Sequence, residues 1–269
     1  MSPIHIVLIT FAVLCAGCWV LSLITHENSW VDRIWSIAPV FYVGEIAQRA
    51  HFHNVRLNVM ALLILLWGAR LTFNFARKGG YSGTEDYRWP VLRASMKPWQ
   101  FQIFNLFFIV LYQNFLLVLI SLPALNAFNH QSTIFNGWDA LLVVLFILFL
   151  AGETFADQEQ WDFQQTKKGI IEHGGTPEER FLTTGLFKYS RHPNYFFELA
   201  QWWVFFFIGC VAADSVVQRT IIGPILLVIL FIGSTQFTEK LSLQKYPEYA
   251  QYQKSTSAVV PWMSKNSLL

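Results

Sequence analysis

The sequence predicts an all-α, polytopic membrane helix bundle, and its composition is the first of three observations that predict it. Of its 269 residues, 54% are apolar and 17% are aromatic, whereas only 13% are charged. Soluble globular domains carry about 25% charged residues. The other two observations are apolar runs of membrane-spanning length and an uneven distribution of lysine and arginine among the loops. We therefore expect the chain to lie in a bilayer, with membrane lipids around it.

Apolar runs long enough to cross a bilayer recur along the chain. A spanning helix needs about 20 mostly apolar residues, and on this criterion we expect about seven transmembrane helices. The second is the shortest and contains Glu45. The first is too long for the apolar core of a signal peptide and has no basic start, so we expect it to be retained. The expected spans are Ile4–Ile24, Ser36–Ala50, Asn58–Ala76, Trp99–Leu122, Trp138–Phe155, Tyr195–Ala213 and Thr220–Phe237.

Lysine and arginine are concentrated in alternate loops. They gather in segments 25–35, 77–98, 156–194 and 238–269, whereas the intervening loops hold only Arg49, Arg56 and Arg219. Because basic residues stay preferentially on the cytoplasmic side, we expect the amino terminus outside and the carboxyl terminus in the cytoplasm. The expected location is the bacterial inner membrane, or the endoplasmic reticulum membrane if the host is eukaryotic, with the functional site facing the cytoplasm.

The same composition argues against several kinds of function. A net charge of +2 is too small to indicate nucleic-acid binding. Cys15, Cys18 and Cys210 fall in expected spans, and the Cys15-x-x-Cys18 spacing has no further ligands beside it, so neither a metal nor a disulfide is expected. No repeat or long hydrophilic stretch interrupts the chain, which predicts a single membrane domain over residues 1–269.

A polar ladder enters the membrane at the end of the fifth expected span. Glu153, Asp157, Gln160 and Gln164 are spaced by four, three and four residues, which places them on one face of a helix. An acid at membrane depth costs at least about 2.5 kcal/mol, so such acids tend to line a cavity or to pair with a cation. We favour a ligand site for Glu153 and Asp157, and the alternative is a structural pair between helices.

A second polar face begins the sixth expected span. Pro193 suits the first turn of a helix, and Asn194, Glu198 and Gln201 then share one face. An ordinary membrane-interface segment does not need an asparagine, a glutamate and a glutamine on the same face. This face is therefore expected to continue the polar lining of a site.

Two basic residues stand immediately before this helix. Arg191 suits a phosphate, because a guanidinium can donate to two phosphate oxygens at once, and His192 could bind the same anion. The alternative is that Arg191 and His192 are ordinary cytoplasmic-side residues, and that Tyr195 and Trp202 belong to an interfacial aromatic belt.

The tail after the last expected span is rich in aromatic and basic residues. Residues 239–254 contain Tyr246, Tyr249 and Tyr252 together with three lysines, of which Lys240 is the first. Tyrosine rings can pack on an adenine ring, and lysines can neutralise phosphates. The alternative is an amphipathic helix lying at the membrane surface.

One stretch of the chain carries a resemblance to a known family. It reads Gly185-Leu186-Phe187-Lys188-Tyr189-Ser190-Arg191-His192-Pro193-Asn194-Tyr195, and Glu198 and Trp202 follow it. This stretch resembles the C-terminal signature of the steroid 5-alpha-reductase family, especially its bacterial members of unassigned substrate. The resemblance covers roughly residues 153–262 and is only topological before them. A shorter form, Arg-His-Pro-x-Tyr, also occurs in membrane methyltransferases of the isoprenylcysteine carboxyl type.

The resemblance implies NADPH as the cofactor, held by helices and loops in the C-terminal half. In the family, the positions of Glu153 and Asp157 contact the nicotinamide end, although the family often has Asn at the first of them and a basic residue where this chain has Gln164. The expected catalytic residues are Asp32, Glu153 and Tyr195. The expected cofactor-binding residues are Arg77, Arg88, Asp157, Gln160, Tyr189, Arg191, His192, Asn194, Glu198, Lys240, Tyr249 and Tyr252.

The resemblance also implies a small lipophilic substrate. In steroid reductases a Gln-Glu pair on the second helix and a Tyr on the third polarise the substrate ketone. Here Asp32 with Arg33 is the topological match to the pair, and Trp67 falls where the Tyr would be, but an indole cannot donate a phenolic proton. The proton donor is therefore arranged differently, or the substrate is not a 3-keto-4-ene steroid. The expected substrate-contacting residues are Trp35, Trp67, Gln113 and Trp202.

These features predict an integral-membrane oxidoreductase that transfers hydride from NADPH to an activated C=C bond in a steroid- or isoprenoid-like enone. The alternative is an S-adenosylmethionine-dependent methyltransferase of a lipid or isoprenylated substrate. Those enzymes favour two adjacent glutamates where this chain has Glu239-Lys240. A third possibility, a non-enzymatic lipid-binding or scaffold protein, is disfavoured by the polar residues at membrane depth.

Overall fold

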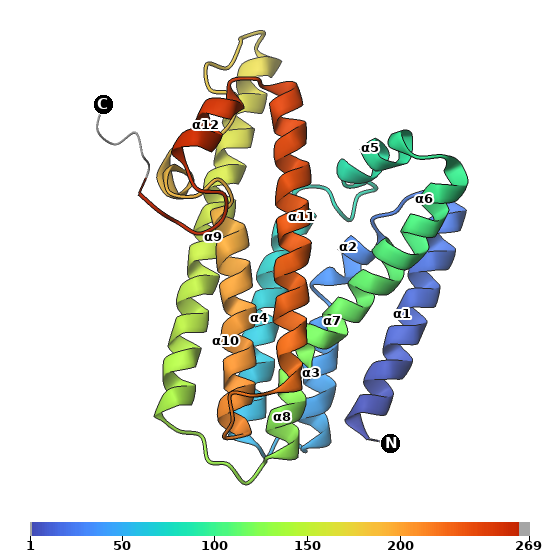
Figure 1. Cartoon of the computed structure of the whole chain (residues 1–269), viewed down its shortest axis with the longest axis vertical. Helices are drawn as coiled ribbons and strands as arrows, with labels where there is room; N and C mark the ends of the chain where they lie inside the picture. Colours follow the sequence, from blue (N-terminus) through green and yellow to red (C-terminus); the bar gives the residue numbers. More distant parts are fainter. Residues whose placement is uncertain (1, 264–269) are drawn as a thin grey trace. The chain divides into compact units, whose positions relative to one another are not determined.

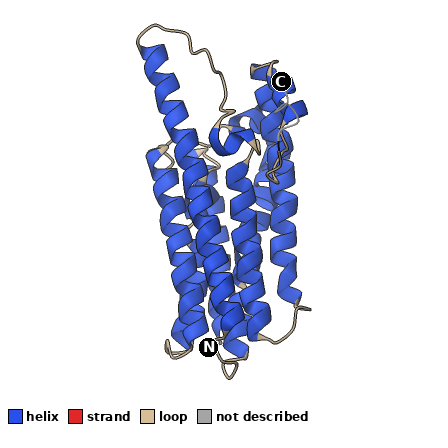
Figure 2. Cartoon of the chain, turned by 90° about the vertical axis from the view of Figure 1, so that its left-hand side faces the viewer, coloured by secondary structure: helices blue, strands red, loops and turns tan. Residues whose placement is uncertain are grey.

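The computed structural model describes residues 2–263, and within them the fold is helical throughout. Figure 2 shows the same result, with helices joined by loops and turns. Backbone pairing of the strand kind is confined, in this part of the chain, to an isolated bridge between Ser190 and Ser257. The predicted all-α fold class is confirmed.

Figure 1 shows the course of the helices along the chain. The first half contains a π-helical segment, η1, that continues α6 into α7. The second half contains three long helices, α9, α10 and α11, together with two short 3-10 turns, η2 and η3. The elements are α1 (Pro3–Thr25), α2 (Trp30–Trp35), α3 (Ala38–Arg49), α4 (Val55–Arg77), α5 (Arg88–Ser95), α6 (Pro98–Phe104), η1 (Asn105–Tyr112), α7 (Gln113–Ser121), α8 (Pro123–Asn129), α9 (Gly137–Glu172), η2 (Gly185–Lys188), α10 (Pro193–Ala212), η3 (Arg219–Ile221), α11 (Ile222–Lys245) and α12 (Tyr249–Ser255).

Six helical stretches in residues 2–263 are long and apolar enough to cross a membrane, which fits a polytopic membrane protein. They are Pro3–Thr25, Val55–Arg77, Pro98–Asn129, Gly137–Glu172, Pro193–Ala212 and Arg219–Lys245. The expected second span, Ser36–Ala50, is the exception, because its helix α3 has only 12 residues. About seven transmembrane helices were expected, and six of the expected spans have the length to cross a membrane.

The reason for the short second helix is a break between α2 and α3. A turn at Ser36 and Ile37 separates them, and α3 begins with Pro39 in its first turn. Proline has no N–H group with which to continue a helix from the preceding turn, so it starts a new helix there. In Figure 1, α2 and α3 follow one another along the path from the end of α1 to the start of α4.

The chain divides into two compact units, and both are discontinuous in sequence. Unit 1 contains residues up to Val144 and the segment Trp202–Leu227, whereas unit 2 contains Leu145–Gln201 and the chain from Val228 onward. The helices α9, α10 and α11 each contribute one part to unit 1 and another to unit 2.

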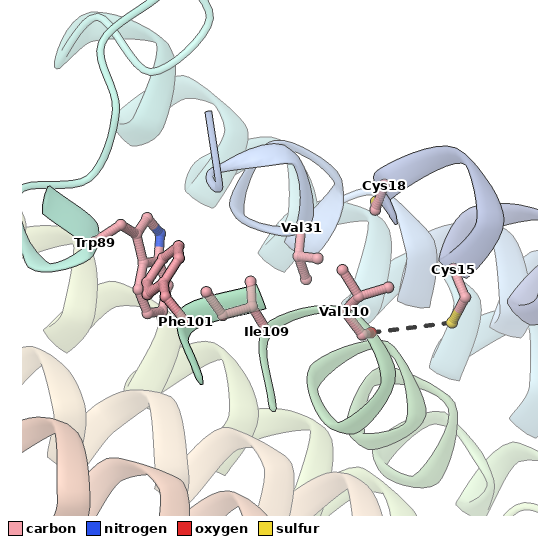
Figure 3. Close-up of a cluster of buried hydrophobic side chains, with 7 residues drawn as sticks. All are labelled: Cys15, Cys18, Val31, Trp89, Phe101, Ile109 and Val110. Atoms are coloured by element: carbon pink, nitrogen blue, oxygen red, sulfur yellow. Dashed lines mark hydrogen bonds between the residues drawn. The ribbon is translucent and has the colours of Figure 1, made fainter. Parts of the chain in front are cut away.

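Unit 1 is centred on α3, which packs against α1, α4, α7 and α8. Its core includes Tyr42, Leu57 and Ile64, all without solvent exposure. Gly68 of α4 allows a close approach, since a Cβ there would lie 2.6 Å from the backbone oxygen of Ser36. A second apolar cluster joins α1 to η1, and Figure 3 shows the Cys15 thiol directed at the backbone oxygen of Val110, 3.9 Å away.

A buried ion pair fastens one end of unit 1. The guanidinium of Arg56 donates through Nε and Nη2 to the two carboxylate oxygens of Asp139, each at 2.7 Å, and both side chains are almost fully buried. Arg56 also donates to the backbone oxygens of Thr133 and Ile134. Because every contact of this pair is satisfied, the loop between α8 and α9 is anchored to the first turn of α4 and of α9.

Unit 2 contains the part of α9 from Leu145 onward, the part of α10 up to Gln201 and the part of α11 from Val228 onward, together with the polar segments that follow α9 and α11. In its loop between α9 and α10, Glu159 accepts a hydrogen bond from the backbone N–H of Leu186 at 3.0 Å. Gly185 adopts a φ of +60°, and a Cβ on it would lie 2.0 Å from the Glu159 carboxylate. Glycine is therefore required at this turn, which begins the motif before α10.

Candidate functional site

Unit 2 contains a polar core built by α9 and α10. Glu153, Asp157 and Glu198 are each 5% exposed, and Gln201 is fully buried. The Gln201 side-chain Nε2 donates to Glu153 Oε2 at 2.6 Å and to the backbone oxygen of Phe197 at 3.1 Å. The sequence places these residues at spacings of four and three on the two helices. The predicted faces are buried at these four positions, whereas Gln160 and Asn194 are partly exposed and Gln164 is exposed.

Aromatic packing and one glycine bring the two helices close at this depth. The ring of Phe149 contacts the rings of Phe196 and Phe197, with centroids 6.2 and 6.3 Å apart. A Cβ on Gly152 would lie 2.6 Å from the Phe197 ring. Gly152 therefore leaves room for Phe197 on the surface of α9, one residue before Glu153.

Helix α11 adds two hydroxyl groups that the sequence analysis did not select. Thr235 is 6% exposed, and the side-chain oxygens of Thr235 and Thr238 are both buried without a hydrogen-bond partner among the described residues. Their spacing of three residues, with Glu239 and Ser242 on the same helical face, was the available signal. Threonines are common in membrane helices, so this signal is weak in a sequence.

The Arg191 side chain forms the best-connected polar cluster of unit 2. Its Nε and Nη2 donate to the two oxygens of Glu239 at 2.6 and 3.0 Å. Its Nη1 donates to the backbone oxygens of Gln253, at 3.1 Å, and of Thr256. His192 Nε2 and Gln253 Nε2 complete the surroundings of the Glu239 carboxylate at 3.1 and 2.7 Å. We call these five residues, Arg191, His192, Glu239, Gln253 and Thr256, the tail clasp.

The tail clasp holds the C-terminal tail alongside the segment that precedes α10. The backbone N–H groups of Arg191 and His192 donate to the backbone oxygens of Ser257 and Ala258 at 2.9 and 3.0 Å. The N–H of Trp262 donates to the backbone oxygen of Tyr189 at 2.9 Å. All three guanidinium nitrogens of Arg191 are thus engaged inside the chain, and a phosphate would have to displace Glu239 to reach them.

The tail tyrosines pack within the chain as well. Tyr249 and Tyr252 are 5% and 8% exposed, and both rings contact Phe181, with centroids 5.0 and 5.7 Å apart. The Tyr252 hydroxyl donates to the backbone oxygen of Phe187. Burial raises the pKa of both hydroxyls above the ordinary range of a phenol. An adenine ring would have to displace Phe181 to stack on Tyr252.

Two clefts of unit 2 border this tail. One of about 450 Å³ is lined by Gln236, Glu239, Lys240, Leu243, Gln244 and Gln253. The other, of about 300 Å³, is lined by Phe181, Thr183, Lys188, Glu248, Gln251, Tyr252, Ser255 and Thr256. Each cleft therefore has one lysine in its wall, and both lysines are solvent-exposed.

The remaining predicted residues of unit 2 lie around the start of α10 and on α9. The Tyr195 ring stacks on the His192 ring, with centroids 5.1 Å apart and an interplanar angle of 19°, and its other contact is an edge-to-face pair with Phe231. Asn194 and Gln160 are partly exposed, and Tyr189 is 45% exposed. Thus Glu153 and Tyr195, two of the three predicted catalytic residues, share a unit with most of the predicted cofactor-binding residues.

The third predicted catalytic residue, Asp32, lies in unit 1. One of its carboxylate oxygens accepts from the indole N–H of Trp89 at 2.9 Å. The neighbouring Asn28 and Arg93 are joined through Glu85, which accepts from the Asn28 backbone at 2.8 Å and from Arg93 at 2.5 Å. The segments that precede α2 and α5 are therefore joined, and the contact of Asp32 with Trp89 links the two helices themselves.

The predicted cofactor residues of unit 1 have acceptors nearby. Arg88 donates to both carboxylate oxygens of Asp86, at 2.8 and 2.9 Å, and Arg77 donates to Asn74 at 2.9 Å. Both arginines belong to the polar segment around residues 77–98, where the sequence analysis placed them.

Two of the predicted substrate residues meet in unit 1. Trp67 and Trp202 are almost fully buried, and their rings form an edge-to-face pair with centroids 4.9 Å apart. Gln113 begins α7 and is 4% exposed, whereas Trp35 packs against the apolar cluster around Cys15. Trp67 and Trp202 are thus brought together, and Trp35 belongs to a different cluster of the same unit.

Comparison with known proteins places this architecture in a family. The model of a family described as "Protein of unknown function (DUF1295)" matches residues 18–256. The chain belongs to the DUF1295 family. An uncharacterized protein of Schizosaccharomyces pombe is 35% identical over 277 residues, which cover 97% of this chain and 80% of the yeast protein. No solved structure matches the chain.

Proposed function

We propose that this DUF1295 protein is an NADPH-dependent membrane reductase that acts on an activated C=C bond of a lipophilic, steroid- or isoprenoid-like enone. The observation that carries the proposal is the polar core of unit 2, in which Glu153, Asp157, Glu198 and Gln201 are buried inside apolar helices. Acids and amides at membrane depth are costly and tend to serve a ligand. The resemblance of residues 185–195 to the steroid 5-alpha-reductase signature supports the choice of ligand.

The polar side chains at the core of unit 2 support a nicotinamide cofactor as the ligand. NADPH, when bound, supplies a hydride. Glu153, Asp157, Asn194 and Glu198 would face its nicotinamide end, since they offer neutral and acidic acceptors at the polar core. Their task is to orient the ring and to keep water from the reacting carbon.

The phosphates of the cofactor need cations, and one of the candidate cations of unit 2 is already paired with a carboxylate. Arg191 is engaged with Glu239, whereas Lys240 and Lys188 lie exposed in the walls of the two clefts. We assign these two lysines to phosphate groups, with Arg191 fixing the tail that forms one wall of each cleft. Arg77 and Arg88 of unit 1 stay predicted contacts to phosphate or ribose.

The substrate part of the proposal rests on unit 1. Asp32, Trp35, Trp67, Gln113 and Trp202 stay the predicted substrate residues. Trp67 and Trp202 present large apolar surfaces, which suits a lipophilic molecule. A hydrogen bond to the substrate carbonyl would stabilise the negative charge that develops on its oxygen during hydride transfer. The proposed site faces the cytoplasm, where NADPH is supplied.

The direct test is ligand binding to detergent-purified protein. A ligand that binds only the native state raises its apparent stability, so NADPH, NADH and S-adenosylmethionine are compared by thermal shift and calorimetry. A selective NADPH response supports the reductase and justifies a screen of enone lipids. A selective S-adenosylmethionine response instead makes the protein a methyltransferase and overturns the proposal.

One pair of variants ties the binding to the polar core. Asp157→Ala removes a buried acid of α9, whereas Asp162→Ala removes an exposed acid of the same helix. We expect Asp157→Ala to abolish NADPH binding in a protein that remains folded, and Asp162→Ala to bind like the wild type. Retained binding in Asp157→Ala would exclude the polar core as the cofactor site.

A further inference from the structure

Gln201 combines full burial with a side-chain oxygen that the protein does not use. The residue is 0% exposed, and its Oε1 has no hydrogen-bond partner among the described residues. Its Nε2 donates twice, to Glu153 Oε2 and to the backbone oxygen of Phe197. Buried polar atoms in proteins nearly always have a partner, so an unused one requires an explanation.

The orientation of the Gln201 amide is fixed by its two acceptors. Rotating the amide by half a turn would place Oε1 against the Glu153 carboxylate and the Phe197 carbonyl, two groups that also only accept. The repulsion between these oxygens excludes that arrangement. Oε1 is therefore turned away from these two acceptors and is left as a buried acceptor without a partner among the described residues.

The chemistry of this acceptor restricts what it binds. An uncharged amide oxygen takes a hydrogen bond from an N–H or O–H donor and gains nothing from a phosphate or a carboxylate. The neighbouring Glu153 and Glu198 also favour a donor over an acceptor. The partner therefore carries N–H or O–H hydrogens and is neither a phosphate nor a carboxylate.

On the proposed function, one end of the cofactor meets this description. We propose that Gln201 Oε1 accepts a hydrogen bond from the amide –NH₂ of the nicotinamide carboxamide, and that Gln201 is a specificity-determining residue of this protein. Through its Nε2, the same side chain holds Glu153 in place beside the ring. Gln201 thus connects recognition of the carboxamide to the position of the predicted catalytic acid.

The experiment compares two nucleotides that differ at this one group. In the 3-acetylpyridine analogue of NADPH, an acetyl group replaces the carboxamide, so the carbonyl is kept and the N–H donors are lost. Binding of both is measured with wild type, with Gln201→Met, which keeps the length of the side chain without its amide, and with Gln165→Met, an exposed control on α9. Gel filtration and thermal unfolding establish that each variant is folded.

We expect wild type and Gln165→Met to bind NADPH roughly tenfold more tightly than the analogue, which corresponds to one hydrogen bond. Gln201→Met is expected to bind the two nucleotides equally. Undiminished discrimination in Gln201→Met overturns the inference.

The nucleotide comparison on wild type alone keeps the test decisive if Gln201→Met does not fold. Equal affinity of wild type for NADPH and the analogue overturns the assignment of Oε1 to the carboxamide. A wild-type protein that binds neither nucleotide overturns the proposed function itself, so the two failures are distinguishable.

Discussion

The Arg191 side chain joins the segment before α10 to two later parts of the chain, α11 and the end of α12 with its tail. Its guanidinium reaches Glu239 of α11, the last turn of α12 and the tail beyond it. The Arg191 and Glu239 side chains are each 9% exposed, so the charge of each depends on the other. Removing one partner of a buried pair leaves the other charge without compensation, which costs more than the pair contributes when intact.

We therefore expect Glu239→Gln to destabilise unit 2 by about 3 kcal/mol. The measurement is thermal unfolding in detergent, combined with limited proteolysis of the tail after α11. Glu248→Gln is the matched control, because Glu248 pairs with Arg180 at 3.5 Å on the surface, where both side chains are about half exposed. Equal melting temperatures for the two variants would show that the tail clasp does not hold unit 2 together.

The residues of the polar core could be predicted from the sequence better than their partners could. The spacings of Glu153, Asp157, Glu198 and Gln201 predict shared helical faces, and the four side chains are buried. The pairing of Arg191 with Glu239 could not be predicted, because 48 positions separate them and helical periodicity carries no information over such a distance. The sequence suggested that Tyr249 and Tyr252 pack on an adenine ring, but it carried no signal for their contacts with Phe181.

At the scale of the elements, α12 depends on the neutral form of its tyrosines. Burial raises the pKa of Tyr249 and Tyr252 in the folded protein, whereas a phenol of the unfolded chain ionises near pH 10. Because the folded-state pKa is the higher one, the contribution of these groups to stability is complete below about pH 10 and is lost as the pH rises further.

We accordingly expect the segment around α12 to become sensitive to protease at a pH somewhat above about 10, at which the helices of unit 1 are still folded. Tyrosinate absorbance and proteolysis are followed across the same pH series. Tyr252→Phe is expected to flatten the pH dependence, since phenylalanine keeps the ring contact with Phe181 but cannot ionise. A pH profile unchanged by this variant would assign the alkaline transition to other groups.

The elements also show where periodicity alone is insufficient. Six of the seven expected spans are helices of spanning length. The second, expected at Ser36–Ala50, is the 12-residue α3, which begins after the turn at Ser36 and Ile37 with Pro39 in its first turn. The helix α9 extends to Glu172, well past the expected end at Phe155, because its polar continuation has no glycine or proline until Gly169.

For the whole molecule, the sides of the membrane that the termini occupy depend on whether α2 and the short α3 together cross it. Six crossings place both termini on one side, whereas α2 and α3 counted together as a crossing give seven and opposite sides. The loops rich in lysine and arginine favour the second arrangement, with the amino terminus outside. Labelling of single cysteines distinguishes the two.

The native Cys15, Cys18 and Cys210 are buried, and serines in their place give a background without thiols. Ser2→Cys and Lys254→Cys then introduce single thiols at exposed positions near the two ends. We expect a membrane-impermeant maleimide to label Ser2→Cys in intact cells, and Lys254→Cys only after the cells are opened. Labelling of both variants in intact cells would contradict seven crossings.

The interleaving of the two units has a consequence for synthesis of the protein on the ribosome. Unit 1 is complete once Leu227 has been made, whereas unit 2 waits for the chain beyond Val228. The Arg191 side chain is made 48 residues before Glu239, a delay on the order of several seconds at about 5–20 residues per second. During that interval a charge destined for burial has no partner, so a nascent chain stalled between α10 and Glu239 exposes an unpaired arginine that a cell's quality control could recognise.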